Sequence, residues 1–161
     1  MTTLDIELAV SNYLDVRANL IIPNIHWGFG IHECDLLCMS SSGYLKEIEI
    51  KISASDLKRD HLKEHNHEDT RIKSLFFAIP EELLKYINYI PDRAGILVIS
   101  NINGRHRVKI LREAEINRLA TPLSIEDQYK LARLGALRIW SLKKKIKKIN
   151  EIKEIQNETN C

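Results

Sequence analysis

The segment from Leu45 to Ile52 (LKEIEIKI) alternates charged and apolar residues, and this alternation constrains the fold more than any other feature of the chain. Successive side chains of a β-strand point to opposite faces of its sheet. One face of this strand is therefore isoleucine-rich, and the other carries Glu47, Glu49 and Lys51. The pattern is typical of a half-buried strand, whose apolar face packs on a core. A salt-bridged strand on the protein surface would show the same alternation.

A second strand precedes this one, and a short loop joins the two. The run from Glu33 to Met39 is apolar except for its acids, and Ser40–Gly43 follows it. Short loops that contain glycine supply the backbone angles of a β-hairpin turn. With a turn centred near Ser41 and Ser42, Asp35 lies roughly opposite Glu47 to Glu49. The sequence thus predicts two carboxylates at neighbouring positions of one hairpin.

The remaining elements alternate between helix and strand along the chain. The predicted helices are Thr3 to Val16, a capped polar helix from Ser53 to about Glu64, a helix that begins near Pro80, and a long helix from Ser124 to about Ile155. The further predicted strands are Leu20 to Trp27 with an edge or bulge at Pro23, Ser74 to Ile79, the buried strand Gly95 to Ser100, and Arg107 to Leu111 after a hairpin turn at Asn103–Gly104. This order predicts an α/β fold with a mixed β-sheet flanked by helices.

The length of 161 residues suits one folded core rather than two complete domains. We expect a core domain over residues 1–123 and a helical extension over residues 124–161. Three further features predict a cytoplasmic protein with no membrane partner. The N-terminus lacks the basic and apolar regions of a signal peptide, no apolar run is long enough to cross a bilayer, and the three cysteines fit a reducing compartment.

The charge of the chain is unevenly distributed, although its formal net value is only +2. Residues 1–137 carry 17 basic and 19 acidic side chains, whereas the segment from Arg138 to Lys148 carries six basic side chains and no acid. Such a run is typical of a solvated helix face. It is also typical of a surface that binds phosphate groups. Near-neutral net charge therefore does not exclude a nucleic-acid partner.

The hairpin carries the chemistry that the sequence predicts. Two carboxylates at neighbouring sheet positions repel each other unless a divalent cation lies between them. Carboxylate oxygens suit Mg²⁺, which keeps most of its waters and also accepts phosphate oxygens from a substrate. Lys51 projects to the same side of its strand as Glu49 and can orient a water or stabilise charge on a phosphate. This set of groups predicts a site for phosphodiester hydrolysis.

Asp35, followed on the next strand by Glu49, Ile50 and Lys51, resembles the motif of the PD-(D/E)XK nuclease superfamily, which has the restriction-endonuclease-like fold. The resemblance covers residues 3 to 110. The segment after Lys51, with the sequence ISASDL and a capped polar helix, also resembles small phage and DNA-repair members of the superfamily. The resemblance implies that Asp35, Glu49 and the backbone carbonyl of Ile50 bind Mg²⁺ or Mn²⁺, and that Lys51 is the catalytic lysine. The first helix often contributes an acid in this family, and Glu7 is the matching residue. Cys34 stands where the family name has proline.

Two basic regions are candidates for contact with nucleic acid. One belongs to the predicted polar helix and the residues after it: Lys58, Arg59, Lys63 and His65. The other belongs to the basic segment: Lys143, Lys144 and Lys145. The same long helix carries apolar residues at coiled-coil spacing: Ile139, Leu142, Ile146 and Ile149. That spacing leaves three alternatives open, namely homodimerisation, a DNA-facing arm, or an amphipathic helix without a partner.

The function that the sequence favours is a Mg²⁺-dependent nuclease that hydrolyses DNA in a repair, phage or defence context. The first alternative is a non-catalytic nucleic-acid-binding module of the same fold, which would use the basic segment. The second is a structural protein that dimerises through its long helix. Metal-dependent cleavage distinguishes the first hypothesis from the other two.

Overall fold

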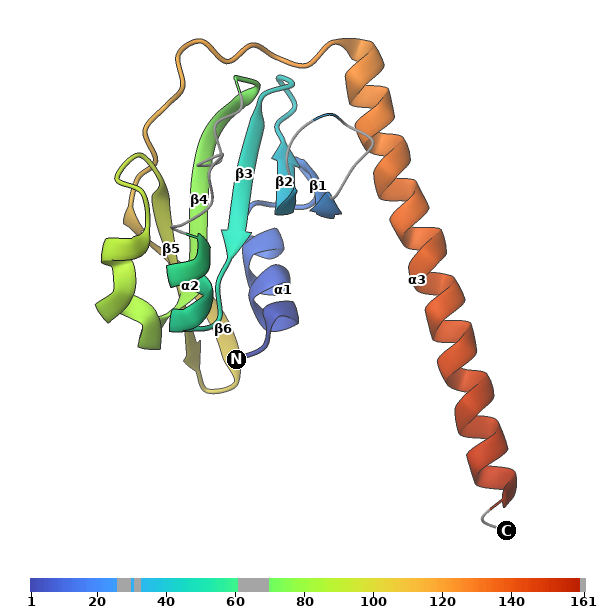
Figure 1. Ribbon diagram of the computed structural model, residues 1–161. Coiled ribbons are helices and arrows are strands. Elements are labelled where there is room, and N and C mark those ends of the chain that lie inside the picture. Colours follow the sequence, from blue (N-terminus) through green and yellow to red (C-terminus); the bar gives the residue numbers. More distant parts are fainter. Residues whose placement is uncertain (26–29, 31–32, 61–69, 160–161) are drawn as a thin grey trace.

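The computed structural model describes residues 1–25, 30, 33–60 and 70–159, and within them the central feature is a six-stranded mixed β-sheet (Figure 1). The strands lie in the sheet in the same order as in the chain. They are β1 (Leu20–Ile25), β2 (Cys34–Met39), β3 (Leu45–Ile50), β4 (Ile72–Pro80), β5 (Gly95–Ile102) and β6 (Arg105–Arg112). The α/β class with a mixed sheet and flanking helices, predicted from the sequence, is confirmed.

Antiparallel and parallel pairs divide the sheet. Strands β1, β2 and β3 form an antiparallel meander, β4 and β5 continue parallel to β3, and β6 returns antiparallel to β5. Both predicted hairpins are present. Gly43 takes a φ of 82° in the β2–β3 turn, and Asn103 and Gly104 take φ values of 51° and 78° in the β5–β6 turn. Left-handed backbone of this kind favours glycine and asparagine, which explains why those residues marked the turns.

The helices cover both faces of the sheet. Helix α1 (Thr3–Tyr13) begins with a capping box at Thr2 and packs on the face that carries Ile48 and Ile50. Helix α2 (Ala54–Asp60) and the 3₁₀ helix η1 (Glu81–Tyr89) cover the opposite face at β4 and β5. The helix predicted after Pro80 is therefore present.

Helix α3 (Ile125–Thr159) packs on the same face of the sheet as α2, but near the edge formed by β1, where it contacts β1 and β2. Its Leu131 is fully buried there with Ile22 and Leu37. Gly135 lets the helix approach β1 closely, because a Cβ at this position would lie 3.2 Å from Ile22 Cδ1. Beyond this contact α3 projects away from the sheet (Figure 1). No helix in the described ranges is long and apolar enough to cross a membrane.

Strand β3 differs from its prediction in one respect that matters for function. The pattern predicted a strand buried on one face only, but Glu47, Glu49 and Lys51 on the charged face are 0%, 3% and 7% exposed. The reason is that the middle of the sheet is parallel and is covered on both faces. Two hydrophobic clusters share the face of these residues, one under α2 and η1 and the other under α3. The alternative of a salt-bridged surface strand is wrong about the surface, although Glu49 and Lys51 do form a salt bridge.

Candidate functional site

Asp35 and Glu49 come together where β2 and β3 reach the ends of their pairing. Leu36 pairs with Ile48 and Leu37 pairs with Glu47, so Asp35 stands one step beyond the last pair, level with Glu49. The Asp35 side chain turns across this end, and its Oδ2 accepts a hydrogen bond of 2.7 Å from the backbone N–H of Ile50. This bond fixes the Asp35 carboxylate beside the residue that follows Glu49.

Glu49 and Lys51 form a buried ion pair on the same face of the chain. Lys51 Nζ donates to Glu49 Oε2 at 2.6 Å. The backbone N–H of Lys51 bonds the carbonyl of Ala78 on β4, at 3.1 Å, and the ammonium lies 5.8 Å from the centroid of the Phe77 ring. Backbone and side chain of Lys51 are therefore both held by β4. Removing such a pair from water costs free energy, which the attraction between its two charges offsets.

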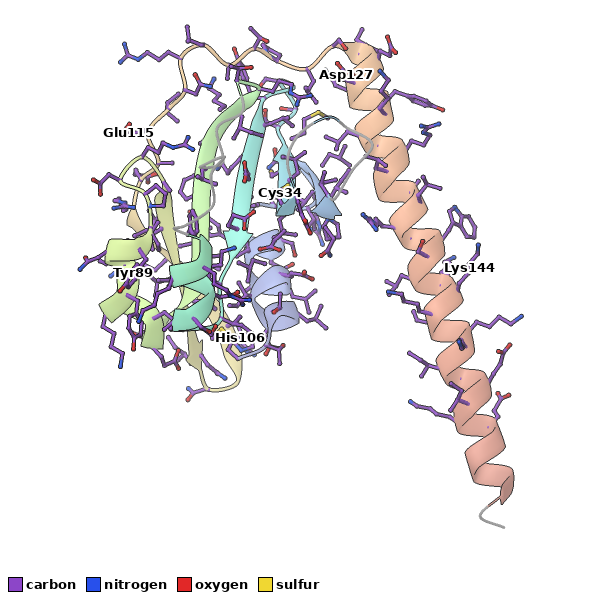
Figure 2. All side chains as sticks on the ribbon, viewed as in Figure 1. Cys34, Tyr89, His106, Glu115, Asp127 and Lys144 are labelled. Atoms are coloured by element: carbon purple, nitrogen blue, oxygen red, sulfur yellow. The ribbon has the colours of Figure 1, made fainter. Side chains whose placement is uncertain are left out.

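Acidic groups outnumber basic groups in this part of the protein interior. Among the described residues, the buried charged side chains are Glu47, Glu49 and Lys51, which together carry one excess negative charge. The pKa of the Cys34 thiol reflects this excess of negative charge (Cys34 is labelled in Figure 2). Its pKa is raised first by burial and then by the negative charges of the surrounding carboxylates, which belong to Glu47, Glu49, Asp35 and Glu33. An excess of negative charge at low exposure is the electrostatic condition that favours a bound cation.

Helix α1 brings a further acid to the same end of the sheet. Glu7 is half-buried, and its pKa is raised first by burial and then by the negative charge of Asp35. A hydrogen bond with the Asn24 side chain acts in the opposite direction and lowers the pKa. Asn24 has a φ of 54° within β1, directly after Pro23. The asparagine that supports Glu7 was missed from the sequence, where only Pro23 marked an irregularity in the strand.

We expect Glu7→Gln to stabilise the protein near neutral pH but not in acid. The raised pKa means that the folded state favours the protonated carboxyl. The stabilising contribution of Glu7 is therefore complete below its unfolded pKa and is lost as the pH rises through the higher folded pKa. An uncharged glutamine keeps this contribution at all pH values. Melting temperatures between about pH 4 and pH 8 test this, with the exposed Glu82→Gln as control; a difference that does not grow with pH contradicts it.

The donors at this site suit a hard divalent cation. Asp35 and Glu49 offer carboxylate oxygens, and the Ile50 carbonyl lies on the strand between Glu49 and Lys51. Within the described part of the chain, no group of three or more histidine, cysteine or acidic side chains is arranged to hold a metal by itself. Mg²⁺ fits such a sparse set, because it needs one or two carboxylates and keeps several waters.

The basic candidates belong to α2, to the residues after it and to α3. On α2, Lys58 stands over the rings of Tyr86 and Tyr89, with Nζ 5.8 Å and 5.5 Å from their centroids, and Arg59 pairs with Asp56 at 2.8 Å. Lys63 and His65 lie outside the described residues. On α3, the candidates are exposed: Lys143, Lys144 (labelled in Figure 2) and Lys145. The structure therefore brings together Asp35, Glu49, Lys51 and Glu7, and it leaves the described basic candidates exposed on α2 and α3.

Comparison with known proteins identifies a matching family and a structure with a similar fold. The model of a family described as "DNA repair protein MmcB-like" matches residues 1–146. The fold is similar to that of a protein of unknown function, SPO1766 from Silicibacter pomeroyi, with a TM-score of 0.60 and 17% sequence identity over 88% of each chain. No curated protein matches the chain.

Proposed function

The chain belongs to the MmcB-like family of DNA repair proteins, and on that premise we propose that it is a Mg²⁺-dependent nuclease that hydrolyses phosphodiester bonds of DNA. The observation that carries this proposal is the buried Glu49–Lys51 pair, 2.6 Å long, at the strand end where Asp35 is fixed. A lysine paired with a glutamate inside a covered sheet is costly in stability. Lys51 directly follows β3, and its ion pair with Glu49 keeps its ammonium at the proposed metal site.

In the proposed mechanism each residue has a separate task. Asp35, Glu49 and the Ile50 carbonyl hold the metal, and Mn²⁺ can replace Mg²⁺. When bound, the metal polarises the phosphate and lowers the pKa of a coordinated water. Lys51 orients the attacking water and stabilises negative charge on the phosphate oxygens. Glu7 accepts a hydrogen bond from a water at the same site.

Surface cations supply the contacts that position DNA. We assign phosphate contacts to two groups, one in or after α2 (Lys58, Arg59, Lys63 and His65) and one on α3 (Lys143, Lys144 and Lys145). The exposed cations of α3 lie in a segment with six basic side chains and no acid. Contacts of this kind give affinity that does not depend on base sequence and that falls steeply with salt.

A cleavage assay tests the proposed function. The full chain is incubated with plasmid, single-stranded and branched DNA, in Mg²⁺, in Mn²⁺ and in a chelator, beside a Lys51→Ala variant. We expect products only with metal and only from the wild-type protein. Cleavage that persists in chelator, or that is undiminished in the variant, refutes the nuclease. Salt-sensitive binding without cleavage would instead favour the non-catalytic binding module.

A further inference from the structure

The outer half of α3 carries a stripe of exposed apolar side chains. The stripe consists of Ile139, Leu142, Ile146 and Ile149, which are 57%, 58%, 48% and 51% exposed. Their spacing of three, four and three residues places them on one side of an α-helix. Ala132 and Gly135 lie on the same side of α3, two turns and one turn before the stripe, and Gly135 faces Ile22 of β1. The stripe therefore continues the side of α3 that packs on the sheet, past the point where that packing ends.

The first part of the stripe forms one wall of a groove. The groove has a volume of about 810 Å³ and lies between α3, β1 and the start of α1. Ile139 and Leu142 line it from α3, and Leu4, which is 59% exposed, lines it from α1. Figure 2 shows the rest of α3, with Lys144 labelled, projecting from the body. A continuous apolar surface of this kind marks a contact with another macromolecule.

The charges beside the stripe select the kind of partner. Arg138 and Lys145 flank the stripe on one side and line the groove, and Lys143 flanks it on the other. The groove lining also includes the acid Glu7, and the Arg138 guanidinium donates a hydrogen bond to the Asn24 carbonyl of β1. The segment from Arg138 to Lys148 contains no acid that could neutralise them. In coiled coils, the residues at such flanking positions decide which partner helix is accepted. The flanks of α3 therefore match a partner that carries negative charges.

A second copy of α3 is a poor match for the same reason. In the antiparallel register that pairs all four stripe residues, Ile139 lies opposite Ile149 and Leu142 opposite Ile146. That register also brings two segments of net charge +6 alongside each other. In a parallel pair, Arg138 of one helix would lie beside Lys143 of the other. Like charges at these positions disfavour association.

We propose that the stripe and its groove bind an amphipathic helix of another protein, one with apolar residues at coiled-coil spacing and acidic residues on both flanks. The apolar residues of that helix cover the stripe, and its acids face Arg138, Lys143 and Lys145. Lys144, Lys147 and Lys148 lie on the other sides of α3, and Lys147 pairs with Glu151 at 3.7 Å. A bound helix therefore leaves Lys144 exposed to phosphate but competes with DNA for Lys143 and Lys145. This inference does not depend on the proposed nuclease activity.

A labelled peptide tests the inference on the full chain. The probe is a synthetic helix of about 21 residues with leucine and isoleucine at coiled-coil spacing and glutamate on the flanks. A scrambled peptide of the same composition and charge serves as its control. In fluorescence anisotropy, we expect the amphipathic peptide to bind at least about tenfold more tightly than the scrambled one. Equal affinities would mean that charge alone attracts the peptide, and would overturn the proposal.

Matched variants locate the binding surface. Leu142→Ser removes a stripe residue, whereas Leu137→Ser removes a leucine of similar exposure, 53%, from the opposite side of the same helix. We expect the first change to weaken peptide binding about tenfold and the second to leave it unchanged. Two results would overturn the proposal: equal losses in both variants, or a dimer of the chain alone that Leu142→Ser dissociates. Weaker DNA binding by Leu142→Ser would assign the stripe to nucleic acid instead.

Discussion

Glu49→Gln is expected to reduce Mg²⁺-dependent DNA cleavage by at least about a thousandfold while the fold remains intact. Glutamine has the shape of glutamate and its amide oxygen can still accept the hydrogen bond from Lys51 Nζ, which now measures 2.6 Å. What the variant loses is a negative charge, and that charge is what the proposed metal site requires. Single-turnover cleavage rates measure the loss, and circular dichroism checks that the secondary structure is unchanged.

Glu47→Gln is the matched control for this prediction. Glu47 lies on the same face of β3, two residues earlier, and is 0% exposed. It pairs with Leu37 inside the hairpin, whereas Glu49 is level with Asp35 at its end. We therefore expect cleavage by the Glu47 variant to stay within about tenfold of wild type. A larger loss from Glu47→Gln than from Glu49→Gln would show that the metal ligand has been assigned to the wrong glutamate.

Lys51→Ala is expected to lower the free energy of unfolding by about 3 to 5 kcal/mol when chelator is present. Lys51 is the buried cation among the described residues, and its removal leaves Glu49 without the ion pair that it now makes, with Glu47 buried on the same strand. Urea unfolding at neutral pH measures the change. Added Mg²⁺ is expected to restore part of the stability, because a cation that binds only the folded state stabilises it.

A more exposed lysine that also forms ion pairs provides the comparison. Lys130 lies 2.9 Å from Glu126 and 3.3 Å from Asp127, but its side chain is 44% exposed. Water screens such a pair, so we expect Lys130→Ala to leave the unfolding curve nearly unchanged. If the two alanine variants lose equal stability, burial of the Glu49–Lys51 pair is not what makes Lys51 important. If added Mg²⁺ does not raise the free energy of unfolding of Lys51→Ala, the carboxylates do not bind Mg²⁺.

Two parts of the site were predictable because they depend on local structure. The alternation in β3 put Glu47, Glu49 and Lys51 on one face, and the turn at Gly43 set the register that brings Asp35 level with Glu49. Both follow from the two-residue period of a strand and from the short loop of a hairpin. The resemblance to PD-(D/E)XK nucleases added Glu7, and the negative charge of Asp35 does act on it.

The surroundings of these residues were not predictable in the same way. A charged strand face has the same pattern whether it meets water or protein, and only the packing of α2, η1 and α3 decides that Glu47, Glu49 and Lys51 are buried. The supporting role of Asn24 depends on a left-handed turn within β1 and on the approach of α1. These contacts join residues that are distant in the chain.

The sequence by itself determined the strands, the turns, the hairpin that aligns Asp35 with Glu49, and the long helix with its basic segment. The tertiary structure alone decided that the Glu49–Lys51 pair lies inside a covered sheet, and that α3 leaves β1 after the contact of Arg138 with Asn24, with an apolar stripe exposed. The physical reason is the range of the interactions. Turn geometry and residue periodicity act between near neighbours, whereas burial and electrostatic environment depend on every element that packs around a side chain.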